Sequence, residues 1–229
     1  MKLKKCIDAC TKSGKKVSID LTANDRYDWN SNLIEDGIVK HALVVGGIDS
    51  RPQIDVGESI SSVSLFNITN KYEMRKCWSE FSDLAKCNSN LINGLKKFLL
   101  KFGLSCNDIS IGIGYDQLCN LTSSDELSLI EYYAWKSLLT EDNALLLLAF
   151  PDAFLDFKSA RILADDLNSL DVQTIMFTNN VTLLDNDITR PDCCFIATND
   201  SVKSFDKSTD REIRQAHNLE KMYVNGVFG

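Results

Sequence analysis

Residues 143–180, NALLLLAFPDAFLDFKSARILADDLNSLDVQTIMFTNN, decide the fold of this chain. They open with an unbroken apolar run, residues 144–150, which is typical of a strand that is covered on both faces. Residues 157–170 predict a helix, because apolar side chains recur there at helical spacing and charged ones fall on the other side. Residues 172–177 form a second apolar run and predict another strand. Strand, helix and strand in this order make a βαβ unit, which requires a parallel sheet and a right-handed crossover.

The same stretch resembles the second half of a P-loop ATPase, in which a hydrophobic strand ends in acidic residues before a helix and a further strand. The residues of nucleotide hydrolysis are missing. The strand ends in Ala149 and Phe150 instead of an acidic pair, and the chain contains no G-x-x-x-x-G-K-[ST] phosphate loop. Gly46 and Gly47 follow another predicted strand, residues 38–45, but no third glycine, Lys or obvious helix follows them, so a plain turn is favoured. Because a fold can persist without its active site, we predict ATPase-like architecture with no ATPase activity and no nucleotide.

The composition indicates a globular chain. Its 229 residues are 44% hydrophobic, enough for a sizeable core. No apolar stretch approaches the roughly 20 residues that span a bilayer, and no secretory signal is recognisable, so we expect a cytoplasmic protein without a membrane partner. The eight cysteines match neither a disulfide module nor a zinc site. The net charge of −7 argues against a generally basic nucleic-acid binder but leaves room for a local basic patch.

The middle of the chain is predicted to be helical. Residues 72–86 and 91–102 carry apolar side chains at helical spacing. A third helix is indicated by Ser123 and Glu126, which have the spacing of a capping box. We therefore predict an α/β fold in which residues 1–70 and 140–229 form a degenerate P-loop ATPase-like head with a parallel sheet, and an α-helical leg, residues 71–139, is inserted into it.

Two carboxylates follow the first strand of the βαβ unit. Asp152 and Asp156 stand where ligands gather in open α/β sheets, beyond the carboxyl end of a strand. Their oxygens could bind a hard cation, or the two residues could simply end a strand and begin a helix. The only histidines, His41 and His217, lie beside a predicted buried strand and in a polar tail, which gives little support to a catalytic triad.

From about residue 96 to residue 197, the order of elements resembles the small spacer-acquisition protein of type II-A CRISPR systems. The likeness is carried by the helix before Gly103, a helix at residues 125–139, the βαβ stretch, and the closing strand CCFIA at residues 193–197. It implies a homotetrameric ring that encircles linear duplex DNA and binds calcium between head and leg. It also implies that the ring cooperates with the CRISPR integrase and effector nuclease proteins. Where that family holds calcium, this chain offers only Asp108.

The sequence thus predicts a non-enzymatic protein that binds the ends of linear double-stranded DNA as an oligomeric ring and supports spacer acquisition. The candidate phosphate contacts are basic residues of two predicted helices: Lys96, Lys97, Lys101, Lys158 and Arg161. The candidate calcium ligands are Asp108, Asp152 and Asp156. Two alternatives remain open. One is a nucleotide-free ATPase-like scaffold or regulatory protein that docks a protein partner, and the other is a metal-dependent enzyme that handles a phosphorylated substrate.

Overall fold

The structure is a computed structural model. It describes residues 6–10, 16–22, 41–45, 53–55, 63–68, 70–105, 109, 112–140, 145–197, 202–214 and 216–228.

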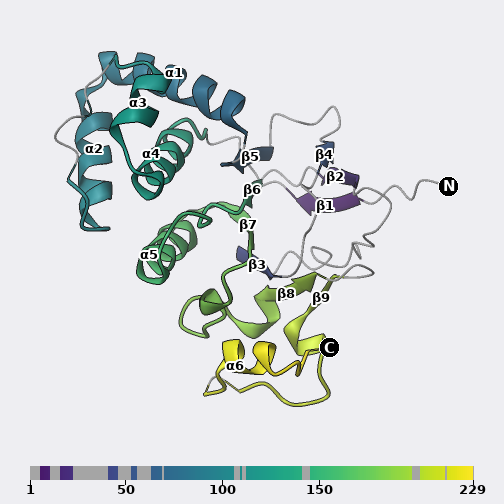
Figure 1. The fold of residues 1–229 in the computed structure, drawn as a ribbon. Coiled ribbons are helices and arrows are strands. Elements are labelled where there is room, and N and C mark those ends of the chain that lie inside the picture. Colours follow the sequence, from purple (N-terminus) through teal and green to yellow (C-terminus); the bar gives the residue numbers. More distant parts are fainter. Residues whose placement is uncertain are drawn as a thin grey trace.

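A six-stranded sheet forms the centre of the molecule, in the order β5-β6-β7-β3-β8-β9 (Figure 1). Its strands are β3 (His41–Val45), β5 (Val63–Asn67), β6 (Leu145–Ala149), β7 (Gln173–Thr178), β8 (Cys194–Ala197) and β9 (Val202–Ser204). The first five strands in this order are parallel, and β9 pairs antiparallel with β8 at one edge. The chain is therefore an α/β protein with a mostly parallel sheet, which confirms the predicted fold class.

The βαβ unit is present as predicted. Helix α5 (Phe157–Asn168) connects β6 to β7, and the two strands pair directly, with Leu145 opposite Gln173 and Ala149 opposite Phe177. Every residue of β6 is buried, and the strand has a neighbouring strand on each side.

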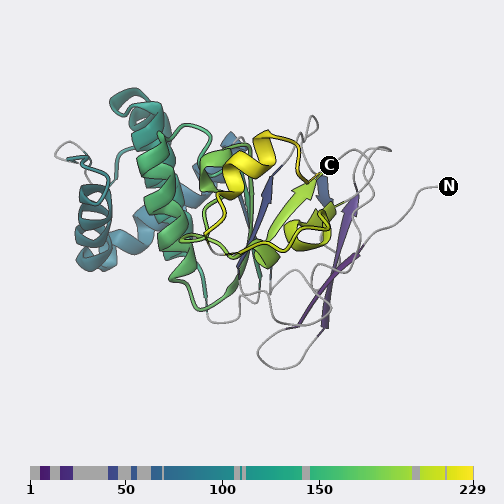
Figure 2. The same ribbon diagram turned by 90° about the horizontal axis from the view of Figure 1, so that it is seen from below.

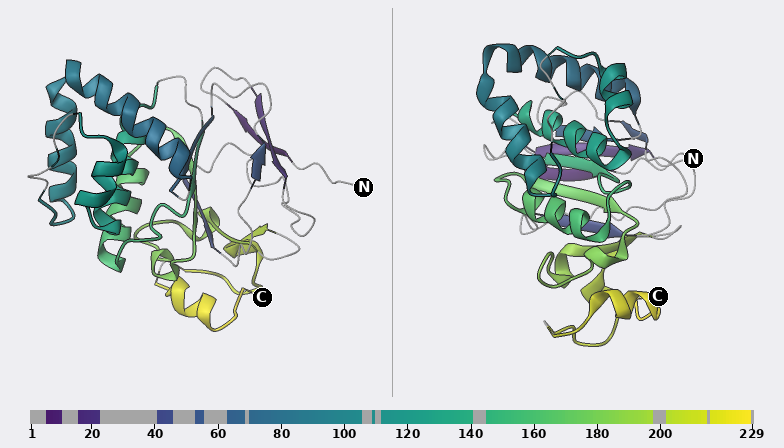
Figure 3. Two further views of the ribbon diagram at one scale, coloured as in Figure 1. Left: turned by 45° about the horizontal axis from the view of Figure 1, so that its top comes forward. Right: turned by 60° about the vertical axis from the view of Figure 1, so that its left-hand side comes forward.

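A second, three-stranded sheet is antiparallel, in the order β1-β2-β4. Its strands are β1 (Cys6–Cys10), β2 (Lys16–Thr22) and β4 (Gln53–Asp55). Figure 3 (left) shows this small sheet on the side of the main sheet that faces away from α1 to α5.

Among the described residues between β5 and β6, four helices are present. They are α1 (Lys71–Cys87), α2 (Ser89–Leu100), α3 (Tyr115–Leu121) and α4 (Ser124–Ser137). The side chain of Asn70 caps the N-terminus of α1. Asn88 is the one residue between α1 and α2, and its side chain caps the N-terminus of α2. Aromatic rings join these helices to the sheet: Phe66 of β5 lies with its centroid 5.3 Å from that of Trp135 and 6.0 Å from that of Tyr132.

The C-terminal part packs beside β8 and β9. It contains the short helices η3 (Val181–Leu183), η4 (Pro191–Cys193), η5 (Phe205–Lys207) and α6 (Leu219–Val224). Phe205 is fully buried there against the rings of Tyr223 and Phe228. Of the helices in the described ranges, none has the length and apolar character needed to cross a membrane.

Gly94 of α2 allows a close approach to Tyr133 of α4. A Cβ at this position would clash with the Tyr133 hydroxyl and lie 3.3 Å from Cζ. Alanine favours a helix over glycine by about 1 kcal/mol. We nevertheless expect Gly94→Ala to lower the free energy of unfolding by about 1–3 kcal/mol, because the rigid ring must move. Urea denaturation measures this change.

Tyr133→Phe provides the control for this prediction, since it removes the clashing oxygen. In that background, Gly94→Ala should cost less than half as much. An equal cost in both backgrounds would mean that the hydroxyl is not the obstacle.

Candidate functional site

The order of the strands distinguishes one position at the carboxyl edge of the sheet, between β7 and β3. β3 and β7 are adjacent and parallel, with Val45 opposite Thr178 at their carboxyl ends. From β3 the chain continues to β5, the next strand of this sheet, which lies on the β7 side of β3. From β7 it continues to β8, which lies on the β3 side of β7, so the two connections run in opposite directions. Figure 2 shows β3 and β8 running in the same direction across the sheet. The edge between β7 and β3 is therefore a topological switch point, where open α/β sheets bind ligands.

A strained turn brings Asp152 to this edge. β6 ends at Ala149, and Phe150 then adopts a positive φ of 52°, which no other non-glycine residue in the described part of the chain has. The Phe150 N–H donates to the carbonyl of Phe177, at 2.9 Å, and so holds the turn against β7. A left-handed conformation costs a bulky residue about 1–2 kcal/mol. Strain of this kind persists where the surroundings enforce it, often at functional sites.

Asp152 itself is buried, with 5% of its surface exposed. The hydroxyl of Thr178 donates to its Oδ2 at 2.6 Å. The backbone N–H of Asn180 donates in turn to the Thr178 hydroxyl at 2.9 Å, and the side chain of Asn180 accepts from the hydroxyl of Thr182 at 2.6 Å. These contacts fix the carboxyl group at the end of β7.

Burial raises the pKa of Asp152, and hydrogen bonds from Thr178 and Asn180 oppose that rise. A buried carboxyl group with a perturbed pKa at a ligand-binding edge is a candidate for holding a cation or exchanging a proton.

The other predicted metal ligands do not join Asp152. Asp156 is exposed, and its Oδ1 accepts from the N–H of Ser159 at 2.7 Å as the cap of α5. This hydrogen bond lowers the pKa of Asp156. Asp108 lies outside the described residues. Within the described ranges, no three His, Cys, Asp or Glu side chains come together in a way that could hold a metal ion.

This arrangement does not fit calcium, which takes six to eight oxygen ligands. Magnesium asks for fewer protein ligands, because protein sites often hold it through one or two carboxylates, with water and the phosphate oxygens of a ligand completing the shell.

The five basic residues predicted to contact phosphate fall into two groups. Lys96, Lys97 and Lys158 are exposed. Lys101, which is also exposed, and Arg161 form ion pairs within the molecule: the Lys101 Nζ lies 3.4 Å from Asp166, and the Arg161 guanidinium lies 2.6 Å from Asp185. The structure does not gather the five charges at the carboxyl edge that holds Asp152.

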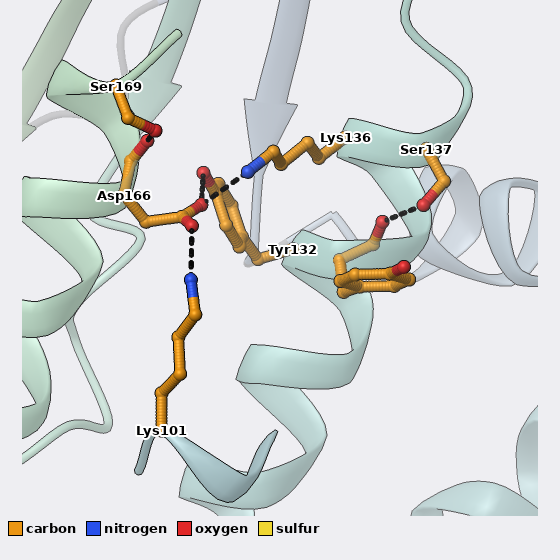
Figure 4. A network of polar contacts seen from close by, with 7 residues as sticks. Lys101, Tyr132, Lys136, Ser137, Asp166 and Ser169 are labelled. Carbon is orange, nitrogen blue, oxygen red and sulfur yellow. Dashed lines mark hydrogen bonds and ion pairs between the residues drawn. The ribbon is translucent and has the colours of Figure 1, made fainter. Parts of the chain in front are cut away.

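Sequence reasoning missed a polar cluster around Asp166 on α5. Its side chain is 6% exposed and accepts from the Tyr132 hydroxyl at 2.9 Å and from the Lys136 Nζ at 2.6 Å, in addition to Lys101 (Figure 4). The cluster ties α5 to α4 and to the end of α2. Asp165 and Asp166 look alike in the sequence, and only the packing of the helices separates them.

A buried carboxyl group in α4 was also missed. Glu131 is 5% exposed, and the hydroxyl of Tyr115 donates to its Oε1. Burial raises the pKa of Glu131 to about 7, against the lowering effects of Tyr115 and Lys71.

Comparisons with known proteins give no family assignment. No protein-family model matches the chain, and no curated protein matches it. Solved structures are similar to it, including two ABC transporter structures. One is a metal-chelate type ABC transporter in an inward-facing conformation, with 13% identity and a TM-score of 0.44 over 98% of this chain and 90% of that chain. The other is cbiO1 from Clostridium perfringens, part of the ABC transporter complex cbiONQ, with 11% identity and a TM-score of 0.45 over 97% of this chain and 90% of that chain.

These findings contradict the resemblance drawn from the sequence. Both structures come from ABC transporters, and neither is a CRISPR spacer-acquisition protein. The predicted homotetrameric ring on linear double-stranded DNA, its CRISPR integrase and effector nuclease partners, and its calcium are therefore wrong. So are the predictions of a non-enzymatic protein and of no nucleotide, and the nucleotide-free scaffold gains no support.

The reason for the error is physical. The resemblance depended on element order and hydrophobicity, and parallel βαβ cores of many functions share both. Both TM-scores lie below 0.5, so the function has to follow from the residues of this chain.

Proposed function

We propose that this chain binds a phosphorylated small molecule together with Mg²⁺ at the carboxyl edge between β7 and β3. The observation that carries the proposal is the buried carboxyl group of Asp152, held against Thr178 at the switch point of a parallel sheet. The third function considered from the sequence was a metal-dependent enzyme that handles a phosphorylated substrate. The proposal keeps the metal and the phosphorylated ligand of that function, with Asp152 as the metal ligand, and concerns binding alone.

The surroundings of Asp152 suit this role. Thr178 and Asn180 orient the carboxylate, and a ligand with fixed orientation loses little freedom when an ion binds. The low dielectric of a buried site strengthens the attraction between a carboxylate and a cation. The cation would offset the negative charge of the phosphate groups and link them to the protein.

The proposal is tested by isothermal titration calorimetry with inorganic triphosphate and with ATP, each in the presence of MgCl₂ or EDTA. We expect binding in Mg²⁺ and loss of binding in EDTA. Asp152→Asn, which keeps the shape of the side chain and removes its charge, should weaken binding in Mg²⁺ by about tenfold or more. Because burial raises the pKa of Asp152, binding should weaken as the pH is lowered, at a higher pH than for an exposed aspartate.

Asp156→Asn is the matched control. It removes a carboxylate four residues away and keeps the cap of α5, because asparagine caps helices as well as aspartate. It should leave the affinity unchanged. Binding that is equal in Mg²⁺ and EDTA, or the same loss in both variants, would refute a metal site at Asp152. Phosphate release measured on the same samples shows whether ATP is hydrolysed as well as bound.

A further inference from the structure

The segment that carries Asp152 also presents two aromatic rings to solvent. Phe154 is 52% exposed, and Phe157, the first residue of α5, is 68% exposed. The chain has 11 phenylalanines, and all except these two are buried or partly buried. Among the described residues, neither ring contacts another aromatic ring. The exposure is thus a property of this short segment and not of phenylalanines in general.

The place of the two rings relates them to the site. Both belong to the connection that leaves the carboxyl end of β6, passes through the strained Phe150 and enters α5. Asp152 lies on the same connection, two residues before Phe154. A ligand held at Asp152 therefore has two flat apolar surfaces close by along the chain.

Other exposed apolar side chains do not show this arrangement. Tyr72 and Leu84 lie on α1, Leu100 lies on α2, Leu121 on α3 and Val224 on α6. Single exposed apolar residues are ordinary on protein surfaces. Two aromatic rings three residues apart, on the connection that also carries a buried carboxylate, offer a stacking surface for a planar group.

We propose that the ligand is a nucleoside diphosphate or triphosphate, whose base stacks on Phe154 or Phe157 while its phosphates meet the cation at Asp152. This inference rests on the proposed function and specifies its ligand class. Every nucleobase has a flat face that stacks on aromatic side chains, so the rings favour a nucleotide over a phosphorylated sugar or inorganic phosphate.

The test compares ATP and GTP with inorganic triphosphate, all in Mg²⁺, by calorimetry on the full chain. We expect both nucleotides to bind about tenfold or more tightly than triphosphate. The Phe154→Ala, Phe157→Ala double variant should bind nucleotides no more tightly than it binds triphosphate. Its affinity for triphosphate should equal that of the unaltered protein. Phe157→Tyr in the otherwise unchanged chain keeps a stacking ring and should retain nucleotide affinity. Val224→Ala, which removes an equally exposed apolar side chain on α6, is the control and should change neither affinity.

The outcomes separate the two proposals. Equal affinity for nucleotides and triphosphate in the unaltered protein overturns base recognition and leaves the Mg²⁺–phosphate site standing. Unchanged nucleotide affinity in the double alanine variant overturns the role of Phe154 and Phe157. Binding of none of the three compounds overturns the proposed function, and the nucleotide inference with it.

Discussion

Replacing Glu131 with glutamine is expected to raise the free energy of unfolding by about 3 kcal/mol at pH 8 and to change it little near pH 4.5. Burial raises the pKa of Glu131 from 4.5 to about 7 in the folded protein. Between these two pH values the folded state binds more protons than the unfolded state. The contribution of this group to stability therefore falls as the pH rises through that window.

Glutamine avoids the loss of stability that accompanies ionisation of the buried carboxyl group, because it is neutral at every pH. Its amide oxygen can still accept the hydrogen bond from the Tyr115 hydroxyl, so the buried contact that the carboxyl group makes is kept. The advantage of the variant should appear gradually between pH 4.5 and pH 7 and stay constant above it.

Urea denaturation of both proteins at several pH values measures the effect. The quantity to compare is the difference in the free energy of unfolding between the variant and the unaltered protein at each pH. Burial also raises the pKa of Asp152, so this residue makes the stability of both proteins depend on pH in the same way, and its effect cancels in the difference. Glu73→Gln, at an exposed position in α1, is the control and should change stability by less than about 0.5 kcal/mol. A Glu131→Gln variant that is less stable than the unaltered protein at pH 8 would show that the carboxylate is stabilised by its surroundings.

The sequence predicted the parallel βαβ core because two properties of it are local. The apolar run at residues 144–150 is too uniform for a strand with one wet face, and the spacing in α5 is helical. Asp152 was also noticed, because residues that follow a buried strand lie at the ligand-binding edge. Its difference from Asp156 depends on the positive φ of Phe150, which turns one carboxylate inward and leaves the other as a helix cap. No propensity predicts such a conformation for phenylalanine.

The remaining polar contacts are not local, and this explains why they were missed. The sequence predicts that Lys101 is a solvated charge near a helix end. In the structure it pairs with Asp166, which lies 65 residues away along the sequence. Glu131 is one polar position on a predicted helix in the sequence, but it is buried where α1 packs on α4 and Tyr115 of α3 donates to it. Pairings of this kind follow from the tertiary structure, and a single sequence carries no pattern for them.

Replacing Asp166 with alanine is expected to lower the free energy of unfolding by about 3 kcal/mol or more. The carboxylate is 6% exposed and accepts from Tyr132, Lys136 and Lys101 (Figure 4). Its removal leaves the fully buried Tyr132 hydroxyl without its acceptor and the Lys136 ammonium, 25% exposed, without its nearest opposite charge. Both losses act where α5 meets α4.

Two substitutions test whether burial of the cluster is the cause. Asp165→Ala removes the neighbouring, exposed carboxylate of α5 and should cost less than about 0.5 kcal/mol. Lys101→Met removes the most exposed member of the cluster, 57% exposed, and should cost less than about 1 kcal/mol.

A double-mutant cycle identifies the group that is left unpaired. In the Asp166→Ala background, Tyr132→Phe removes the buried hydroxyl that has lost its acceptor, so it should recover part of the lost stability. In the unaltered protein the same substitution should be destabilising, because it breaks the hydrogen bond. Salt adds a second criterion: 0.5 M NaCl should reduce the effect of Lys101→Met, whose charge is in contact with water, and leave most of the effect of Asp166→Ala. If Asp166→Ala costs no more than Asp165→Ala at either salt concentration, the cluster does not hold α5 to the helices that precede β6.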